Sequence, residues 1–357
     1  MTRVAARGFT LVEVLVASAI ALVVIATAVT LAMEAQGSWR SESARMDLQQ
    51  RARVAADILT RALRDAGLGP PGPAGGPLTR ATAPILPRRI GARRADPPDV
   101  VRRDALTVIR ALGETDRGVL LLDLPAGAST FEIASSPTCD QPACGLSAGT
   151  HVLLLDGYGN ADIFTVLNVL GAAVTVRHHG PGAAAAYPAG SPVVPVQTTS
   201  FIVDAAARIL REYDGDASDL PLVDDVVGME VEYFGEGRPP ARPRAGAGQA
   251  NCLYGSDGSY NAVLMPALPA PAGLAVLAPS LLSDGPWCGS GASQFDADLL
   301  RIRRVRITLR LQAADPAVRG ADPTRFRHPG TARRPGAMVP DATVVVDVRP
   351  QNLAQGW

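Results

Sequence analysis

Near its amino terminus the chain reads Arg7-Gly8-Phe9-Thr10-Leu11-Val12-Glu13, and an apolar run continues from there to Met33. Between Phe9 and Met33 the only ionisable side chain is that of Glu13. A helix of about 25 residues at a rise of about 1.5 Å per residue is roughly 37 Å long, which is enough to cross a bilayer with some tilt. The stretch therefore predicts a membrane-spanning helix over residues 9–33. Its carboxylate requires an explanation, because a charge at the bilayer centre costs about 2.5–3.5 kcal/mol.

The segment from Gly8 to Glu13, after a short basic leader, resembles the cleavage and methylation signature of type IV prepilins. The resemblance implies that a prepilin peptidase cuts between Gly8 and Phe9, that the new Phe9 amine is N-methylated, and that Glu13 docks against the amine of a neighbouring subunit. Such pairing removes the burial cost of the carboxylate in the assembled state only. A plain signal anchor is the alternative. Ordinary secretory signals, however, have a shorter apolar core with the cleavage site behind it, whereas Gly8 precedes the run.

The flanking charges predict the orientation of the span. Arg3 and Arg7 lie in the leader, residues 1–8, whereas the residues just after Met33 carry mixed charge. Because positively charged segments stay on the cytoplasmic side, we expect a single-pass inner-membrane protein with a cytoplasmic N-terminus and a periplasmic head. The formal net charge is zero and no basic stripe is interleaved with aromatic residues, so no nucleic acid is expected as a partner.

Helical periodicity continues without a break signal from Glu34 to Ala66. Apolar residues recur along one face at spacings of three and four residues: Leu48, Ala52, Ala55, Leu59, Ala62 and Leu63. Gly67, with prolines soon after it, is typical of a helix end. Residues 34–66 are therefore predicted to extend the membrane helix as an amphipathic helix that packs on the protein's own sheet.

Residues 67–99 are rich in Pro and Gly. Because each proline lacks a backbone donor, neither a helix nor a central strand is expected there, and we predict an extended loop or linker. The linker contains a cluster of arginines: Arg88, Arg89, Arg93 and Arg94. These arginines are interpreted as part of a solvated loop, and contact with an anionic lipid or partner is the alternative.

Residues 100–357 read as a β-rich head. The predicted strands, separated by turn signals, are Ala105–Ala111, Gly118–Leu124, Thr130–Ala134, His151–Asp156, Asp162–Val169, Ala172–Arg177, Val193–Val203, Arg208–Tyr213, Val226–Phe234, Leu300–Leu311 and Thr343–Val348. Strands in succession without alternating helices favour an antiparallel sheet. The predicted class is α+β, and the resemblance implies a pilin-like architecture, with the long N-terminal helix packed on this sheet.

Softer patterns extend the resemblance into the head. The segments 208–213 and 221–234 resemble the central hairpin of PilW-type minor pilins, and the segments 62–67 and 301–311 are also similar to that subfamily. This resemblance implies a minor subunit that acts in pilus initiation or at the tip. Its expected partners are the prepilin peptidase and other pilins, contacted through the N-terminal helix, and its final location is an extracellular pilus. An insertion at about residues 236–298 departs from a compact pilin head.

Two alternatives remain open at this stage. A minor pseudopilin of a type II secretion system shares the same leader, so the sequence separates it poorly from a pilus subunit. A signal-anchored periplasmic protein that binds a ligand or cation belongs to another class. It requires that Gly8 is not cut and that Glu13 is dispensable.

Four cysteines lie in the part of the chain expected to be exported, where disulfides persist. Three pairings are possible. We favour Cys139 with Cys144, which closes a short loop, and Cys252 with Cys288, which staples the insertion. A four-cysteine zinc site is disfavoured, because the one close pair is not spaced as CxxC.

The sequence shows no catalytic pattern. Its histidines are scattered: His151, His178, His179 and His328. We find no nucleophile elbow, phosphate loop or HExxH pattern. The head is therefore predicted not to be an enzyme and to need no cofactor.

One acidic stretch partly matches a calcium loop. Asp214, Asp216 and Ser218 take its first, third and fifth places and Asp225 its twelfth. Asp219 stands where the loop requires Gly, and the last ligand is an Asp where a bidentate Glu is needed. An acidic hairpin turn is the favoured interpretation, with weak calcium binding by Asp214, Asp216 and Asp225 as the alternative.

Overall fold

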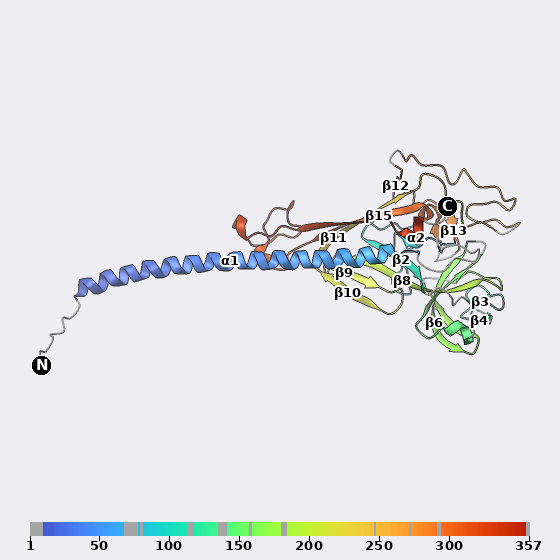
Figure 1. Ribbon diagram of the computed structural model, residues 1–357, viewed down its shortest axis with the longest axis horizontal. Helices are drawn as coiled ribbons and strands as arrows, with labels where there is room; N and C mark the ends of the chain where they lie inside the picture. Colours follow the sequence, from blue (N-terminus) through green and yellow to red (C-terminus); the bar gives the residue numbers. More distant parts are fainter. Residues whose placement is uncertain are drawn as a thin grey trace. The chain divides into compact units, whose positions relative to one another are not determined.

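The computed structural model describes residues 10–67, 78, 81–112, 118–134, 141–156, 159–179, 184–245, 248–270, 273–290 and 294–354. One long helix, α1 (Leu11–Arg64), is followed by a head of antiparallel strands (Figure 1). The fold is α+β with a long N-terminal helix, as predicted. The chain forms two compact units, of which the first is Met1–Gln50 with Gln312–Ala342 and the second is Arg51–Leu311 with Thr343–Trp357.

Helix α1 contains 54 residues, which corresponds to about 81 Å of helix. It ends where the sequence predicted a stop. Gly67 has a φ of +69°, the left-handed conformation that glycine adopts just past a last turn, and its N–H donates to the carbonyl of Ile109 at 2.9 Å. The helix end is thus joined to the first long strand of the sheet.

The last turns of α1, which belong to the second unit, bury one face. Ala52, Ala55, Leu59 and Leu63 are at most 9% exposed and follow spacings of three and four residues. Beside this stripe the Arg110 guanidinium contacts the Asp65 carboxylate at 3.2 Å. The predicted packing of the amphipathic segment on the protein's own sheet is therefore observed for this part of the helix.

The open part of the larger sheet is built on β8 (Pro192–Asp204). On one side β8 pairs with β2 (Ala105–Ala111), which pairs with β1 (Ile85–Leu86). On the other side it pairs with β9 (Ile209–Tyr213), which pairs with β10 (Asp219–Asp224). All of these pairs are antiparallel.

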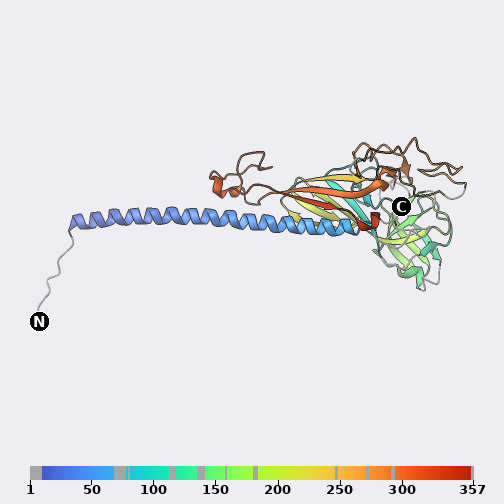
Figure 2. The same cartoon turned by 45° about the horizontal axis from the view of Figure 1, so that its top comes forward.

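The first half of β8 also closes a barrel. The other strands of the barrel are β3 (Gly118–Leu120), β4 (Thr130–Ala134), β5 (His151–Leu155), β6 (Ala161–Leu170) and β7 (Ala173–His178). The pairing runs β8-β3-β4-β7-β6-β5 and returns to β8. These strands, coloured teal to green, curl round one another in Figure 2. The closure removes the exposed edges that an open sheet would leave.

Alternate residues of the barrel strands fill its interior. The buried cluster includes Val152 and Leu154 from β5, Phe164 and Val166 from β6, Val174 and Val176 from β7, and Phe131 and Ile133 from β4. The period of two places the intervening residues on the outer face. The sequence predicted antiparallel strands here but not their closure, because closure depends on β8 pairing along both of its edges.

A smaller sheet follows the order β12 (Ala275–Leu277), β11 (Val226–Gly235), β15 (Ile302–Leu311) and β16 (Ala342–Val348). A two-stranded ribbon joins β13 (Trp287–Cys288) to β14 (Phe295–Asp296). Short helices complete the described head: η2 (Pro142–Gly145), η4 (Ala297–Arg301), η5 (Pro316–Val318), η6 (Pro335–Ala337) and α2 (Gln351–Ala354). The predicted strands at 105–111 and 130–134 match residue for residue. Strands β1, β10, β12, β13 and β14 were missed.

The proline-rich linker is packed over residues 81–88, whereas Arg93 and Arg94 are exposed, as the solvated interpretation expects. Residues 81–88 are all buried, and β1 lies within them. Arg88 is only 2% exposed and its guanidinium donates to the carbonyls of Pro98 and Gln294. The interpretation of Arg88 as a solvated residue was therefore wrong. Proline-rich segments have few N–H donors, so a buried arginine supplies donors that their carbonyls need.

A disulfide staples the insertion. Cys252 and Cys288 are joined with an S–S distance of 1.97 Å, which is one of the two pairings favoured from the sequence. Cys144 is also disulfide-bonded. Cys139, its favoured partner, lies outside the described residues.

We expect the double variant Cys252→Ser, Cys288→Ser to lower the free energy of unfolding by about 2–4 kcal/mol, because the unfolded chain regains the freedom that the cross-link removes. The cysteines are 36 residues apart, so the cross-link closes a substantial loop. Urea unfolding of the full-length protein in detergent measures the change. Reduction of the wild-type protein should cost at least as much, because it also opens the disulfide of Cys144, and an unchanged midpoint in the double variant would contradict a stabilising role.

Candidate functional site

The N-terminus of α1 is closed by a capping box between Thr10 and Glu13. Oε2 of Glu13 accepts from the Thr10 N–H at 2.8 Å and from the Thr10 hydroxyl at 2.9 Å, and the Glu13 N–H donates to Thr10 Oγ1 at 3.3 Å. Such a box satisfies backbone donors that have no partner within the helix. The structure therefore gives Glu13 a local partner that sequence reasoning missed, although Thr10-Leu11-Val12-Glu13 carries the capping pattern. Gly8 and Phe9 lie outside the described residues.

The apolar half of α1 is exposed on every side. All residues from Thr10 to Gln36 are exposed, and among the described residues α1 alone is long and apolar enough to cross a membrane. Its hydroxyl groups are satisfied within the helix, because Ser18, Thr27 and Thr30 donate to the carbonyls of Val14, Val24 and Ala26 at 2.7–2.8 Å. The segment thus presents apolar surface with its polar groups paired, which suits lipid or other apolar helices.

The three calcium candidates face different partners. Asp214 Oδ1 accepts from the N–H groups of Asp216 and Ser218 at 2.8 and 3.1 Å, which shapes the β9–β10 turn. Asp216 pairs with Arg177, and Asp225 contacts Arg51 at 3.2 Å and Arg208 at 3.4 Å. Among the described residues, Asp214 and Asp225 belong to no group of potential metal ligands, and weak calcium binding by Asp214, Asp216 and Asp225 stays an untested alternative.

Two of the histidines, scattered in sequence, lie together. The rings of His151 and His179 are 4.8 Å apart between centroids in an edge-to-face arrangement. His178 lies on the opposite face of its strand, with Nε2 at 2.9 Å from Asp162 Oδ1, and His328 is exposed elsewhere. Successive side chains of a strand point to opposite faces, so the order Arg177-His178-His179 indicated that His178 faces away from the other two.

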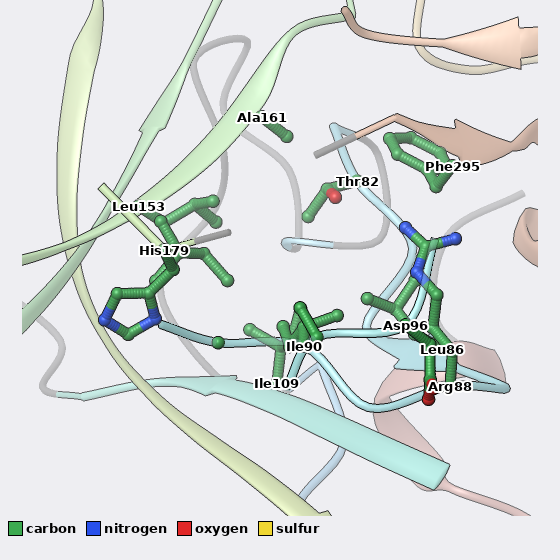
Figure 3. Close-up of a pocket in the computed structure, with 13 residues that line it drawn as sticks. Thr82, Leu86, Arg88, Ile90, Asp96, Ile109, Leu153, Ala161, His179 and Phe295 are labelled. Atoms are coloured by element: carbon green, nitrogen blue, oxygen red, sulfur yellow. The ribbon is translucent and has the colours of Figure 1, made fainter. Parts of the chain in front are cut away.

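A small cavity lies on the outer side of the barrel, between β5, β6 and the packed linker (Figure 3). Its volume is about 40 Å³, which admits a few waters at most. The lining residues are Thr82, Leu86, Arg88, Ile90, Gly91, Ala95, Asp96, Ile109, Leu153, Ala161, Ile163, His179 and Phe295. In Figure 3, Arg88 extends towards Thr82 and Phe295, whereas the imidazole of His179 lies at the opposite end.

Comparison with known families is informative at the N-terminus. Residues 3–29 match the family model described as the prokaryotic N-terminal methylation motif. The chain carries a type IV prepilin signal. This signal is a substrate of prepilin peptidase, and it marks pilin-like proteins and pseudopilins, whose family is structural rather than catalytic. With the exposed apolar helix behind it, the prepilin signal indicates a membrane-anchored, pilin-like protein. No curated protein matches the chain.

Proposed function

We propose that this chain is a prepilin whose mature form is a minor subunit of a type IV pilus, acting in initiation or at the tip. The observation that carries the proposal is the prepilin signal running directly into the exposed apolar part of α1, in which Glu13 is the one charge before Glu34. In this proposal the head performs no reaction and holds no cofactor for one. The mechanism is assembly.

The proposed docking step uses the carboxylate at the start of α1. Cleavage after Gly8 gives Phe9 a positively charged amine, which Glu13 of an axially offset neighbour neutralises. Both contacts of the Glu13 carboxylate to Thr10 use Oε2, and in this proposal Oε1 accepts from the second partner. A carboxylate with several lone pairs serves both roles at once. The capping box and the intersubunit pair are therefore compatible.

The position of the head is inferred from charge and cysteine use. Arg3 and Arg7 favour a cytoplasmic leader, which directs the chain after the span to the periplasm. The Cys252–Cys288 disulfide suits that oxidising compartment. We infer a single-pass inner-membrane precursor that leaves the membrane when its helix joins a filament.

The minor role is supported by the head. The chain of 357 residues is large for a major subunit, and its insertion adds bulk that few positions in a filament accommodate. Two of the segments that resemble PilW-type minor pilins are neighbours in space, because β11 pairs with β15 from Val226↔Leu311 to Gly235↔Ile302. The other two segments lie in β9 of the larger sheet and at the end of α1.

Mass spectrometry of the N-terminal peptide tests the proposal. We expect a chain that begins at methylated Phe9 in membranes of cells with an active prepilin peptidase, and an intact leader in cells without it. The variant Gly8→Leu, expressed beside the active peptidase, should keep its leader, because the cleavage site is lost. An intact leader on the wild-type chain in both strains would overturn the proposal and leave a signal-anchored protein.

A further inference from the structure

The strand register gathers polar side chains on the outer face of the barrel. His151 of β5 lies opposite Thr165 of β6, and Thr165 lies opposite Arg177 of β7. His179 comes two residues after Arg177 and so projects from the same face. Most other outward positions nearby, such as Leu153 and Ile163, are buried and apolar. These polar groups therefore form a local cluster in an apolar setting.

The β9–β10 turn brings Asp216 onto this cluster. Gly215 adopts a φ of +96°, and a Cβ built there would lie 2.8 Å from Thr198 Oγ1 and 3.2 Å from His179 Nδ1. Only glycine permits so close an approach. As a result, one nitrogen of His151, one nitrogen of His179 and a carboxylate oxygen of Asp216 all lie within 4.8 Å of one another.

His179 is the least satisfied member of the cluster. It is 4% exposed, its Nε2 lies 2.6 Å from Thr165 Oγ1, and its Nδ1 has no hydrogen-bond partner. Burial, with the neighbouring His151, lowers the pKa of His179 to about 3, so its ring is neutral. A buried polar atom without a partner costs about 1–3 kcal/mol and calls for an explanation.

We propose that His151, His179 and Asp216 bind one zinc ion. Two imidazole nitrogens and a carboxylate form a donor set that suits zinc, and a water completes the tetrahedron. The hydrogen bond between His179 and Thr165 fixes the tautomer that metal binding needs. His179 Nε2–H donates to the Thr165 hydroxyl, so the lone pair on His179 Nδ1 is left for the metal. Ligands of tetrahedral zinc are about 3.4 Å apart, so a pair of donor atoms within 4.8 Å of each other must close by at most about 1.4 Å when the ion binds.

Arg177 is the competitor for the site. Its guanidinium donates to Oδ1 of Asp216, and its side chain is 50% exposed. Burial raises the pKa of Asp216, but the hydrogen bonds from Arg177 and Thr165 outweigh it, so the carboxylate is ionised. Arg177 neutralises this charge without zinc and turns to solvent when zinc enters. The bound ion then fastens the β9–β10 turn to β5 and to the end of β7.

Zinc titration of the full-length, chelator-treated protein in detergent tests the site. We expect one zinc per chain and a rise in melting temperature for the wild-type protein, because an ion that binds the folded state stabilises it. His151→Gln, at the half-buried rim, should weaken zinc binding at least about 100-fold, and Thr165→Val about 10- to 100-fold. His328→Gln is the matched control, since it removes an exposed histidine outside the cluster, and it should bind as wild type.

A gain of affinity separates the proposal from damage to the fold. Arg177→Gln removes the competing charge and should bind zinc more tightly than the wild-type protein, which misfolding does not produce. Melting curves without zinc confirm that each variant folds. The proposal is overturned if the wild-type protein binds no stoichiometric zinc, if His151→Gln binds as tightly as wild type, or if His328→Gln loses as much affinity as His151→Gln.

Discussion

Replacing Glu13 by alanine should leave the protein inserted and cleaved but nearly absent from filaments. An unpaired carboxylate costs up to about 2.5–3.5 kcal/mol in the bilayer, and pairing with a neighbouring amine removes that cost on assembly. This cost corresponds to a factor on the order of 100 in the equilibrium between free and assembled subunits, and the alanine variant loses that factor. The factor is an upper limit, because Glu13 lies near one end of the span, where the cost of a charge is smaller. Immunoblots of sheared filaments against membranes measure the incorporated fraction.

Two further variants separate docking from helix capping. Glu13→Gln keeps a side chain that serves in a capping box but removes the charge, whereas Thr10→Ala removes the cap and keeps the charge. If the charge docks the subunit, Glu13→Gln fails as completely as Glu13→Ala, and Thr10→Ala still assembles. The reverse pattern, with Glu13→Gln normal and Thr10→Ala defective, would assign Glu13 to the cap alone.

Replacing Arg301 by methionine should lower the free energy of unfolding by about 3–5 kcal/mol, because it leaves a buried carboxylate without its cation. The side chains of Arg301 and Asp298 are 0% and 2% exposed and form an ion pair. Arg301 also donates to the carbonyl of Gly237 at 3.0 Å and to that of Pro266 at 2.8 Å, which ties the start and the middle of the insertion to η4. Urea unfolding of the full-length protein in detergent, followed by tryptophan fluorescence, measures the loss.

The loss should depend on pH in a defined direction. Burial raises the pKa of Asp298 to about 7, and Arg301 opposes that shift, so removing Arg301 raises the pKa further. A carboxyl group whose pKa is higher in the folded state stabilises the fold when protonated, and this contribution is lost as the pH rises through the folded pKa. The Arg301→Met variant should therefore lose less stability at pH 5 than at pH 8.

The controls lie close by. Arg304→Met makes the same change three residues along the chain, where Arg304 and Asp347 are 24% and 32% exposed, and it should destabilise the protein far less than Arg301→Met, because solvent screens the pair. The double variant Arg301→Met, Asp298→Leu removes the orphaned charge and should recover part of the loss. A cost for Arg301→Met no larger than that for Arg304→Met, or a double variant no more stable than the single one, would contradict the assigned role.

The sequence by itself determined the features that depend on local pattern. Three such features are the prepilin signal, the apolar run with Glu13 and the helix end at Gly67. Each depends on residues that are close together in the sequence, so hydropathy and backbone preference predict it without knowledge of the rest of the fold. The long strands, such as β2 and β4, carry enough residues for their pattern to be read. The missed strands have two to six residues, and four of the five have at most three, too few to show a period.

Only the tertiary structure decided how distant segments meet. The pairing of β8 along both edges closes the barrel, and the packed linker turns Arg88 from an expected surface residue into a buried donor for two carbonyls. The same register places His151 beside His179 and lets the Gly215 turn bring Asp216 to them. Such contacts depend on strand registers between residues tens of positions apart, which residue spacing along the chain does not encode.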